Sequence, residues 1–95
     1  MKVSFYANLR DLVGGKTIEA EIDLPARARD LLEVIVTDHP ALRPVLLDED
    51  HEFYGHMKFF INGRDCVYLE DKMDTLIRPG DKVDIFPPVG GGQAG

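Results

Sequence analysis

The side chains with the most reactive chemistry in this chain of 95 residues lack the spacing of a catalytic or metal-binding site. The single cysteine, Cys66, falls on an expected short strand, so we expect it to be packed rather than nucleophilic. His39, His51 and His56 have no metal-site spacing to other ligands, and the acidic run at residues 48–52 lacks the EF-hand pattern. We therefore expect the three histidines and the acidic run to be solvated, and we expect no metal site.

The C-terminal tail, residues 87–95, is the stretch best suited to chemistry, through its backbone rather than its side chains. Pro87 and Pro88 favour an extended path that leaves the preceding strand, and no charged side chain follows Asp84. Three glycines without Cβ atoms then allow the backbone to enter a passage too narrow for side chains: Gly90, Gly91 and Gly92. The alternative interpretation is an ordinary loose terminus.

The composition excludes several classes of protein. With 11 Lys and Arg against 17 Asp and Glu, the net charge is −6, and no basic stripe of the kind that binds nucleic acid is present. No apolar run approaches the roughly 18 residues of a membrane helix, and the N-terminus lacks a secretory signal. One cysteine excludes an intramolecular disulfide and fits a reducing, cytoplasmic setting.

The elements that must position the tail form one domain, residues 1–86. Alternating apolar and polar residues, with turn signals between them, predict a series of strands: residues 2–7, 16–24, 57–61, 66–69 and 82–86. An amphipathic pattern predicts one main helix over residues 28–38. A short second helix over residues 41–47 is expected to be broken by Pro44, and residues 70–77 are expected to be loop with a helical turn.

Two turns are predicted from local residue types. Asn62 followed by Gly63 is typical of a type I′ hairpin turn. Pro79 and Gly80 have the positions that a type II turn favours. The resulting order, two strands, a helix, an irregular segment, a hairpin and a last strand, indicates an α+β fold, the β-grasp or ubiquitin-like roll. We expect a mixed sheet of about five strands and one main helix.

The C-terminal segment makes the resemblance more specific. A Pro-Gly-Asp turn, a strand, a Pro-Pro pair and a glycine tail follow one another within residues 76–92, and this segment resembles the end of the MoaD/ThiS sulfur-carrier family. The opening residues 3–10 resemble the molybdopterin synthase small subunit, a member of that family. The resemblance covers residues 1–92.

The resemblance implies a carrier that is not itself an enzyme. In this family an E1-like adenylating enzyme uses ATP to activate a C-terminal glycine, and sulfur from a persulfide donor then displaces AMP. The resulting thiocarboxylate delivers sulfur inside a partner such as a molybdopterin synthase large subunit-like enzyme. The carrier itself binds no cofactor. Matching the motif places the reactive end at Gly92, beside Gly91, and gives a partner-binding role to the residues before them: Pro87, Pro88, Val89 and Gly90.

This chain departs from the family pattern after Gly92, because Gln93, Ala94 and Gly95 follow. A peptide-bonded Gly92 has no free carboxylate to activate. Three interpretations are open: a peptidase trims the chain to Gly92, Gly95 is the activated end, or the chain has lost the chemistry. We favour trimming.

Three aromatic side chains are expected to gather near the tail. In a β-grasp sheet the last strand lies between the first and third, so the outward positions Tyr6, Phe86 and Phe60 should lie side by side on the face without the helix. Exposed aromatic residues ringed by charge are typical of partner interfaces. The alternative is cross-strand packing that only stabilises the sheet.

Three functions compete. The first is sulfur transfer, for molybdopterin or for thiamine, cysteine or tungsten-cofactor synthesis. The second is a ubiquitin-like modifier joined to lysines, since sulfur and an amine can attack the same adenylate. The third, a non-covalent binding module, is disfavoured by the acidic charge and the glycine tail.

Overall fold

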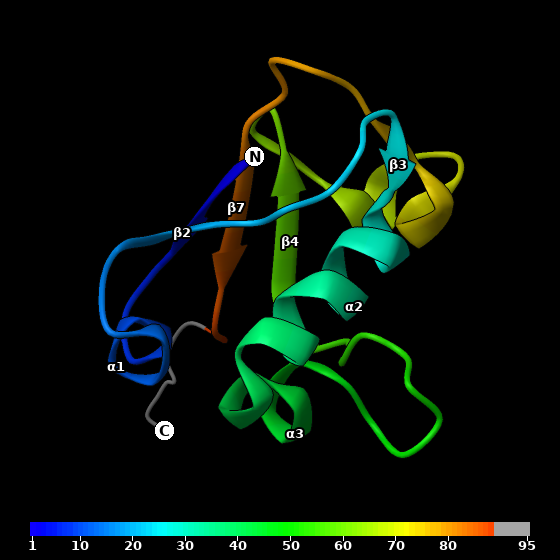
Figure 1. The fold of residues 1–95 in the computed structure, drawn as a ribbon. Helices are drawn as coiled ribbons and strands as arrows, with labels where there is room; N and C mark the ends of the chain where they lie inside the picture. The colour runs from blue at the N-terminus through cyan, green and yellow to red at the C-terminus, as the bar shows by residue number, and fades with distance from the viewer. Residues whose placement is uncertain (89–95) are drawn as a thin grey trace.

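The computed structural model describes residues 1–88, and a five-stranded mixed sheet forms its centre (Figure 1). The strands lie in the order β2-β1-β7-β4-β5. Strand β7 pairs in parallel with β1 and antiparallel with β4, so the last strand lies between the first and the third main strands as predicted. This confirms the α+β, β-grasp fold. The strands have the following bounds: β1 Lys2–Phe5, β2 Thr17–Glu19, β4 Lys58–Ile61, β5 Arg64–Asp65 and β7 Val83–Phe86.

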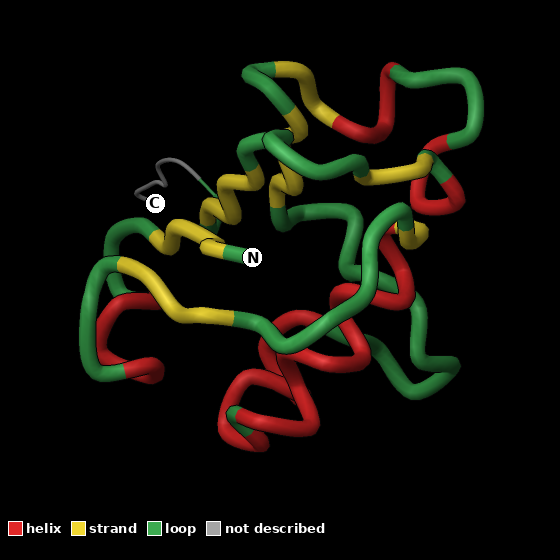
Figure 2. The backbone as a smooth tube through the Cα atoms, turned by 45° about the horizontal axis from the view of Figure 1, so that its top comes forward, coloured by secondary structure: helices red, strands yellow, loops and turns green. Residues whose placement is uncertain are grey.

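The main helix, α2, spans Ala28–Asp38, the range predicted from its apolar spacing. It covers one face of the sheet, and Figure 2 shows it to one side of the strands. The apolar residues of its inner stripe pack against the inward side chains of the strands in a single core. The central members of that core are buried: Val3, Phe5, Leu31, Ile35, Phe59, Val83 and Ile85.

Short elements complete the chain. Helix α1, Leu9–Val13, follows β1 and ends at Gly14, whose φ of 75° suits a residue without a Cβ. The others are short helices and one small sheet: η1 Pro40–Leu42, α3 Arg43–Leu46, η2 Cys66–Tyr68 and η3 Lys72–Asp74, with β3 Ala26–Arg27 paired to β6 Leu76–Ile77. Within residues 1–88, no helix is long and apolar enough to cross a membrane.

The second strand is shorter than the alternating pattern at residues 16–24 predicted. Strand β2 ends at Glu19, which pairs with Lys2, and the last bond of this edge joins the amide of Ala20 to the carbonyl of Met1. The Met1 amino group donates back to the Ala20 carbonyl at 2.6 Å, and no strand of the described chain pairs with residues 21–24. Alternation continues in the sequence, but a strand needs a neighbour for its hydrogen bonds.

The predicted strand at residues 66–69 was wrong. The turn at Asn62 and Gly63, with φ of 53° and 82°, starts the pairing at once, so Arg64 and Asp65 form β5. The Asp65 carboxylate then accepts a hydrogen bond from the amide of Val67, 3.1 Å away, and caps the 3₁₀ turn η2. A turn capped by a side chain, η2 at Cys66–Tyr68, therefore takes the place of the predicted strand.

The role of Pro44 also differs from the prediction. It does not break a helix over residues 41–47, because it lies in the first turn of α3, where the missing N–H costs no intrahelical bond. The helical turn expected within residues 70–77 is present as η3, but the same segment also contributes β6, which was not predicted.

Candidate functional site

The tail leaves the domain at the end of β7. That strand stops at Phe86, Pro87 is half-buried and Pro88 is exposed. Because β7 runs parallel to β1, this end of the sheet is the one at which β1 passes into α1 (Figure 1). The predicted site residues beyond Pro88 lie outside the described residues: Val89, Gly90, Gly91 and Gly92.

The structure brings the three predicted aromatic residues together. The Tyr6 ring stacks on the Phe86 ring with centroids 4.2 Å apart and planes 11° apart. The Phe60 ring meets Phe86 edge-to-face at 5.1 Å. We call Tyr6, Phe60 and Phe86 the aromatic cluster. Stacked and edge-to-face rings attract one another, and Phe86 contacts both of its neighbours in these two ways.

The register of the strands explains the cluster. Phe5 lies opposite Ile85 on the parallel side of β7, and both are fully buried, so the next residues, Tyr6 and Phe86, point to the other face. Phe60 lies opposite Asp84 across the antiparallel ladder and shares that outward direction. All three rings are only partly buried on the face away from α2. The interface assigned to them stays a prediction, but they are neither scattered nor hidden.

Asp84 lies beneath this cluster and was not among the predicted site residues. It is 5 % exposed, and the Tyr6 hydroxyl donates a hydrogen bond of 2.8 Å to its Oδ1 atom. That hydrogen bond, together with burial, raises the pKa of Tyr6, so the phenol stays protonated at neutral pH. The alternation of Val83, Asp84 and Ile85 places this carboxylate outward, but its partner becomes evident only from the β1–β7 register.

Two cationic side chains flank the cluster. The guanidinium of Arg10, from α1, lies 5.2 Å from the centre of the Tyr6 ring, and its Nε atom donates to the carbonyl oxygen of Phe5 at 2.8 Å. Such a cation over a ring face is attracted by the negative face of the π system. The Lys58 ammonium, on β4, lies 3.7 Å from the Asp65 carboxylate. The aromatic surface is therefore bordered by charge.

A network of hydrogen bonds fixes the opposite end of β7. The Asn62 side chain donates to Asp81 at 3.0 Å and accepts from the amide of Lys82 at 2.9 Å. Asp81 also accepts from the amide of Arg78 at 2.8 Å, which closes the turn around Gly80. The backbone bond from Arg78, followed by the Asn62 amide, lowers the pKa of Asp81. These bonds determine where β7 begins, and therefore where the tail leaves the sheet.

Among the described residues, the cysteine, histidine and acidic side chains do not form a second site. Cys66 is 2 % exposed, and burial, with a smaller contribution from Asp65, raises the pKa of its thiol to about 11. The burial confirms that the cysteine is packed, as predicted. Within the described part of the chain, no group of three or more His, Cys, Asp or Glu side chains is placed to hold a metal ion.

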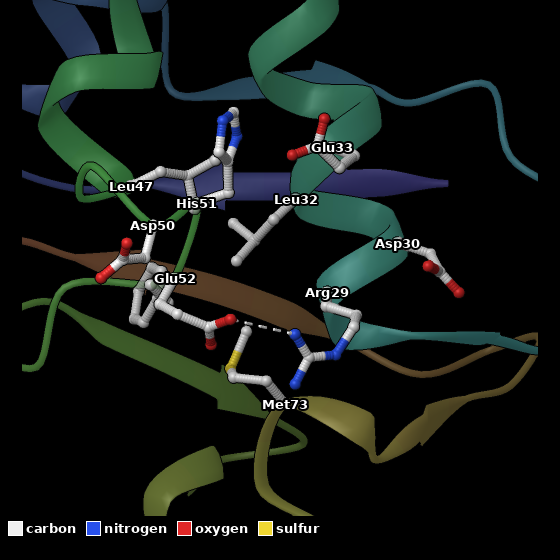
Figure 3. A pocket seen from close by; sticks show the side chains of 10 residues that line it. Arg29, Asp30, Leu32, Glu33, Leu47, Asp50, His51, Glu52 and Met73 are labelled. Atoms are coloured by element: carbon white, nitrogen blue, oxygen red, sulfur yellow. Dashed lines mark ion pairs between the residues drawn. The ribbon is translucent and has the colours of Figure 1, made fainter.

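A hollow of about 230 Å³ lies on the other side of the domain, between α2 and the acidic loop (Figure 3). Arg29 and Glu52 point toward one another across it, 3.7 Å apart, and Leu32 and Met73 point into the same hollow. Arg29 also forms an ion pair with Asp74, in which its Nε atom donates a hydrogen bond to the carboxylate. This hydrogen bond lowers the pKa of the Asp74 carboxyl. The arginine thus ties α2 to η3 and to the loop.

Comparison with known proteins gives a consistent result over the whole described fold. The family model described as "ThiS family" matches residues 3–92. Small archaeal modifier protein 3 of Haloferax volcanii is 37% identical over 92 residues, which cover 97% of this chain and 98% of that protein. The molybdopterin synthase sulfur carrier subunit of Chlamydomonas reinhardtii is 29% identical over the same shares of the two chains. The crystal structure of SAMP1 from Haloferax volcanii matches with a TM-score of 0.83 and 30% identity, covering 97% of this chain and 98% of that one.

Proposed function

This chain belongs to the ThiS family of ubiquitin-like sulfur carriers, and we propose that it carries sulfur as a thiocarboxylate on Gly92. Members of this family are carriers without catalytic activity of their own, so the chain is a substrate of other enzymes rather than an enzyme. The proposal concerns which residue bears the sulfur, how it is loaded and where the sulfur goes.

The loading chemistry needs an activated acyl group, because a free carboxylate is a poor electrophile. An E1-like enzyme joins the Gly92 carboxylate to AMP from ATP and releases pyrophosphate. A persulfide sulfur attacks the acyl carbon and AMP leaves. A second thiol then cleaves the remaining S–S bond and leaves the thiocarboxylate, a good sulfur nucleophile at neutral pH. The carrier supplies only a reachable end, and ATP is bound by the activating partner.

The observation that carries the proposal is the position of the aromatic cluster at the end of β7, where Pro87 and Pro88 begin the tail. Tyr6 and Phe86 form a partly exposed surface at the strand end from which Pro87 and Pro88 lead outward. An enzyme that binds this surface has the tail within reach of its own active site. The family match also ends at Gly92, which supports Gly92 over Gly95 as the acyl-bearing residue.

We further propose which pathway receives the sulfur and that the chain is trimmed in the cytoplasm. The relative named as a molybdopterin synthase sulfur carrier subunit favours molybdopterin synthesis, with a large subunit-like partner that receives the sulfur. A cytoplasmic peptidase would remove Gln93, Ala94 and Gly95 before loading. Thiamine, cysteine and tungsten-cofactor pathways use the same loading chemistry and are the alternative destinations of the sulfur.

The test compares chains that end at Gly91, Gly92 and Gly95. Each is incubated with the E1-like enzyme of the same host and ATP, and the exchange of labelled pyrophosphate into ATP is measured. We expect exchange with the Gly92 chain and little with the other two. Mass spectrometry of the protein isolated from its host should then find the end at Gly92 with one oxygen replaced by sulfur. An intact Gly95 end carrying that sulfur would reject trimming.

A second function is favoured by a specific likeness. The relative of 37% identity is named a small archaeal modifier protein, so attachment to lysines through the same adenylate is the alternative. Enrichment of tagged chain from host cells, followed by digestion and mass spectrometry, distinguishes the two. Peptides with lysine joined to the Gly92 carbonyl support the modifier, and a thiocarboxylate without conjugates supports the carrier alone.

A further inference from the structure

A buried carboxylate on the face without the helix is unusual and needs a reason. Asp84, at 5 % exposure, is the one buried charged or polar residue among residues 1–88. It does not lie in the apolar core, because its neighbours Val83 and Ile85 point there instead. Burying an ionised carboxylate is unfavourable unless donors compensate it. Fold formation alone would be served as well by an apolar residue at this position.

The contacts of Asp84 identify what it does. Its Oδ1 atom accepts the Tyr6 hydroxyl at 2.8 Å, whereas the Lys82 ammonium is farther away, 3.9 Å from Oδ2. The Tyr6 ring is therefore held at two places, by its hydroxyl on Asp84 and by its face on Phe86. Arg10 lies over the same ring. Since a tyrosine side chain has two rotatable angles, these contacts leave it one orientation.

We propose that Asp84 is a positioning residue that holds Tyr6 flat against Phe86 and so keeps the aromatic cluster in the arrangement that the activating enzyme binds. The inference rests on the proposed function and goes beyond it, because it assigns a role to a residue that is not itself part of the tail. An aromatic surface that is ordered before binding loses less side-chain freedom on binding. We therefore expect loss of the carboxylate to weaken docking by about two- to tenfold.

Two substitutions separate the hydrogen bond from the charge. Asp84→Asn keeps the size and an oxygen acceptor for the Tyr6 hydroxyl but removes the negative charge. Asp84→Ala removes both. If Asp84 acts through Tyr6, the asparagine variant should behave like the original protein and the alanine variant should not. Asp23→Ala, in the exposed connection between β2 and β3, is the matched control for loss of one acidic side chain.

The first measurement uses the free protein and does not depend on any partner. The aromatic NMR signals of Tyr6 are shifted by the ring current of Phe86 as long as the two rings stack. We expect that shift in the original protein and in Asp84→Asn, and its collapse in Asp84→Ala, with the methyl signals of Ile85 unchanged. An unchanged Tyr6 shift in Asp84→Ala would overturn the proposal.

The second measurement tests the effect on docking. In pyrophosphate exchange by the host E1-like enzyme, with every chain ending at Gly92, Asp84→Ala should raise the KM for the carrier about two- to tenfold and leave kcat unchanged. A purely structural role would lower the Tm and leave this KM unchanged at temperatures where the variant is folded. Equal KM values for Asp84→Ala and the original protein would overturn the proposal, and so would an asparagine variant as impaired as the alanine variant.

A further pair of variants keeps the test decisive if Asp84→Ala does not fold. Tyr6→Phe removes only the hydroxyl, and Tyr68→Phe is its control, since Tyr68 is 84 % exposed on η2. The proposal expects a raised KM for the first and no change for the second, and equal values would overturn it. If the unsubstituted chain that ends at Gly92 supports no exchange at all, the proposed function fails, and the NMR comparison still decides whether Asp84 holds Tyr6.

Discussion

The two faces of strand β7 differ in what their residues do. Val83 and Ile85 point toward α2, are fully buried and make only apolar contacts in the core. Asp84 and Phe86 point the opposite way, where a buried carboxylate and a partly exposed ring lie side by side on the open face. Packing explains the first pair completely. Burying the carboxylate of the second pair lowers the stability of the fold but orders the aromatic side chains at the surface. A docking face requires such order, and folding alone does not.

The largest expected effect comes from the inward face. Ile85→Ala removes buried methyl groups from the centre of the core and should lower the free energy of unfolding by about 2–5 kcal/mol. Urea denaturation followed by circular dichroism measures this loss. Because an inward change leaves the outward rings in place, activation by the E1-like enzyme should be retained wherever the variant is folded. A stability loss below about 1 kcal/mol would contradict the assignment of Ile85 to a tightly packed core.

The outward face should show the reverse pattern. Phe86→Ala removes the ring that both Tyr6 and Phe60 contact, and we expect the KM for the carrier in pyrophosphate exchange to rise by about 30-fold, the scale of an interface hot spot. The loss of unfolding free energy should be smaller, about 1 kcal/mol, because the ring is not in the core. If Phe86→Ala loses as much stability as Ile85→Ala and binds normally, the cluster only stabilises the sheet.

The sequence was informative wherever a local pattern determines the structure. The apolar spacing of α2 predicted its range of Ala28–Asp38, and Asn62 with Gly63 predicted the hairpin turn. The aromatic cluster was also predictable, because alternation gives the outward direction and the β-grasp order gives the neighbours. In each case the deciding information lies within a few residues or in the strand order.

The missed features depend on partners far apart in the chain. The β3–β6 pair joins Ala26 to Ile77, and neither segment has a strand pattern of its own. The Asp84–Tyr6 bond joins residues 78 positions apart and follows only from the exact parallel register. The wrong strand at residues 66–69 has a different cause, since its β-favouring residues were overridden by the cap from Asp65.

A smaller effect is expected at the end of β7 away from the tail. Asp81→Asn weakens two hydrogen bonds and should cost about 1 kcal/mol at neutral pH. The pKa of Asp81 is lowered in the folded protein, so its stabilisation is present above the unfolded value of about 3.9 and disappears as the pH falls through the folded value. The stability difference between the two proteins should therefore shrink below about pH 4. A difference that stays constant down to the acid limit would contradict this account.

The last prediction concerns the slow reaction of a buried thiol, and it tests whether the core around Cys66 is closed to solvent. Cys66 is buried and the pKa of its thiol is about 11, so at pH 8 only about one thiol in a thousand is ionised, and the thiolate is the reactive form. Modification by a thiol-specific disulfide reagent should be at least about a hundredfold slower in the native protein than in urea. The rate is followed by the absorbance of the released thiol. Ile85→Ala should speed it, because it lowers the free energy of opening, whereas Tyr6→Phe on the open face should not. Equal acceleration by both variants would mean that the two faces open together and are not separable in the way that their contacts indicate.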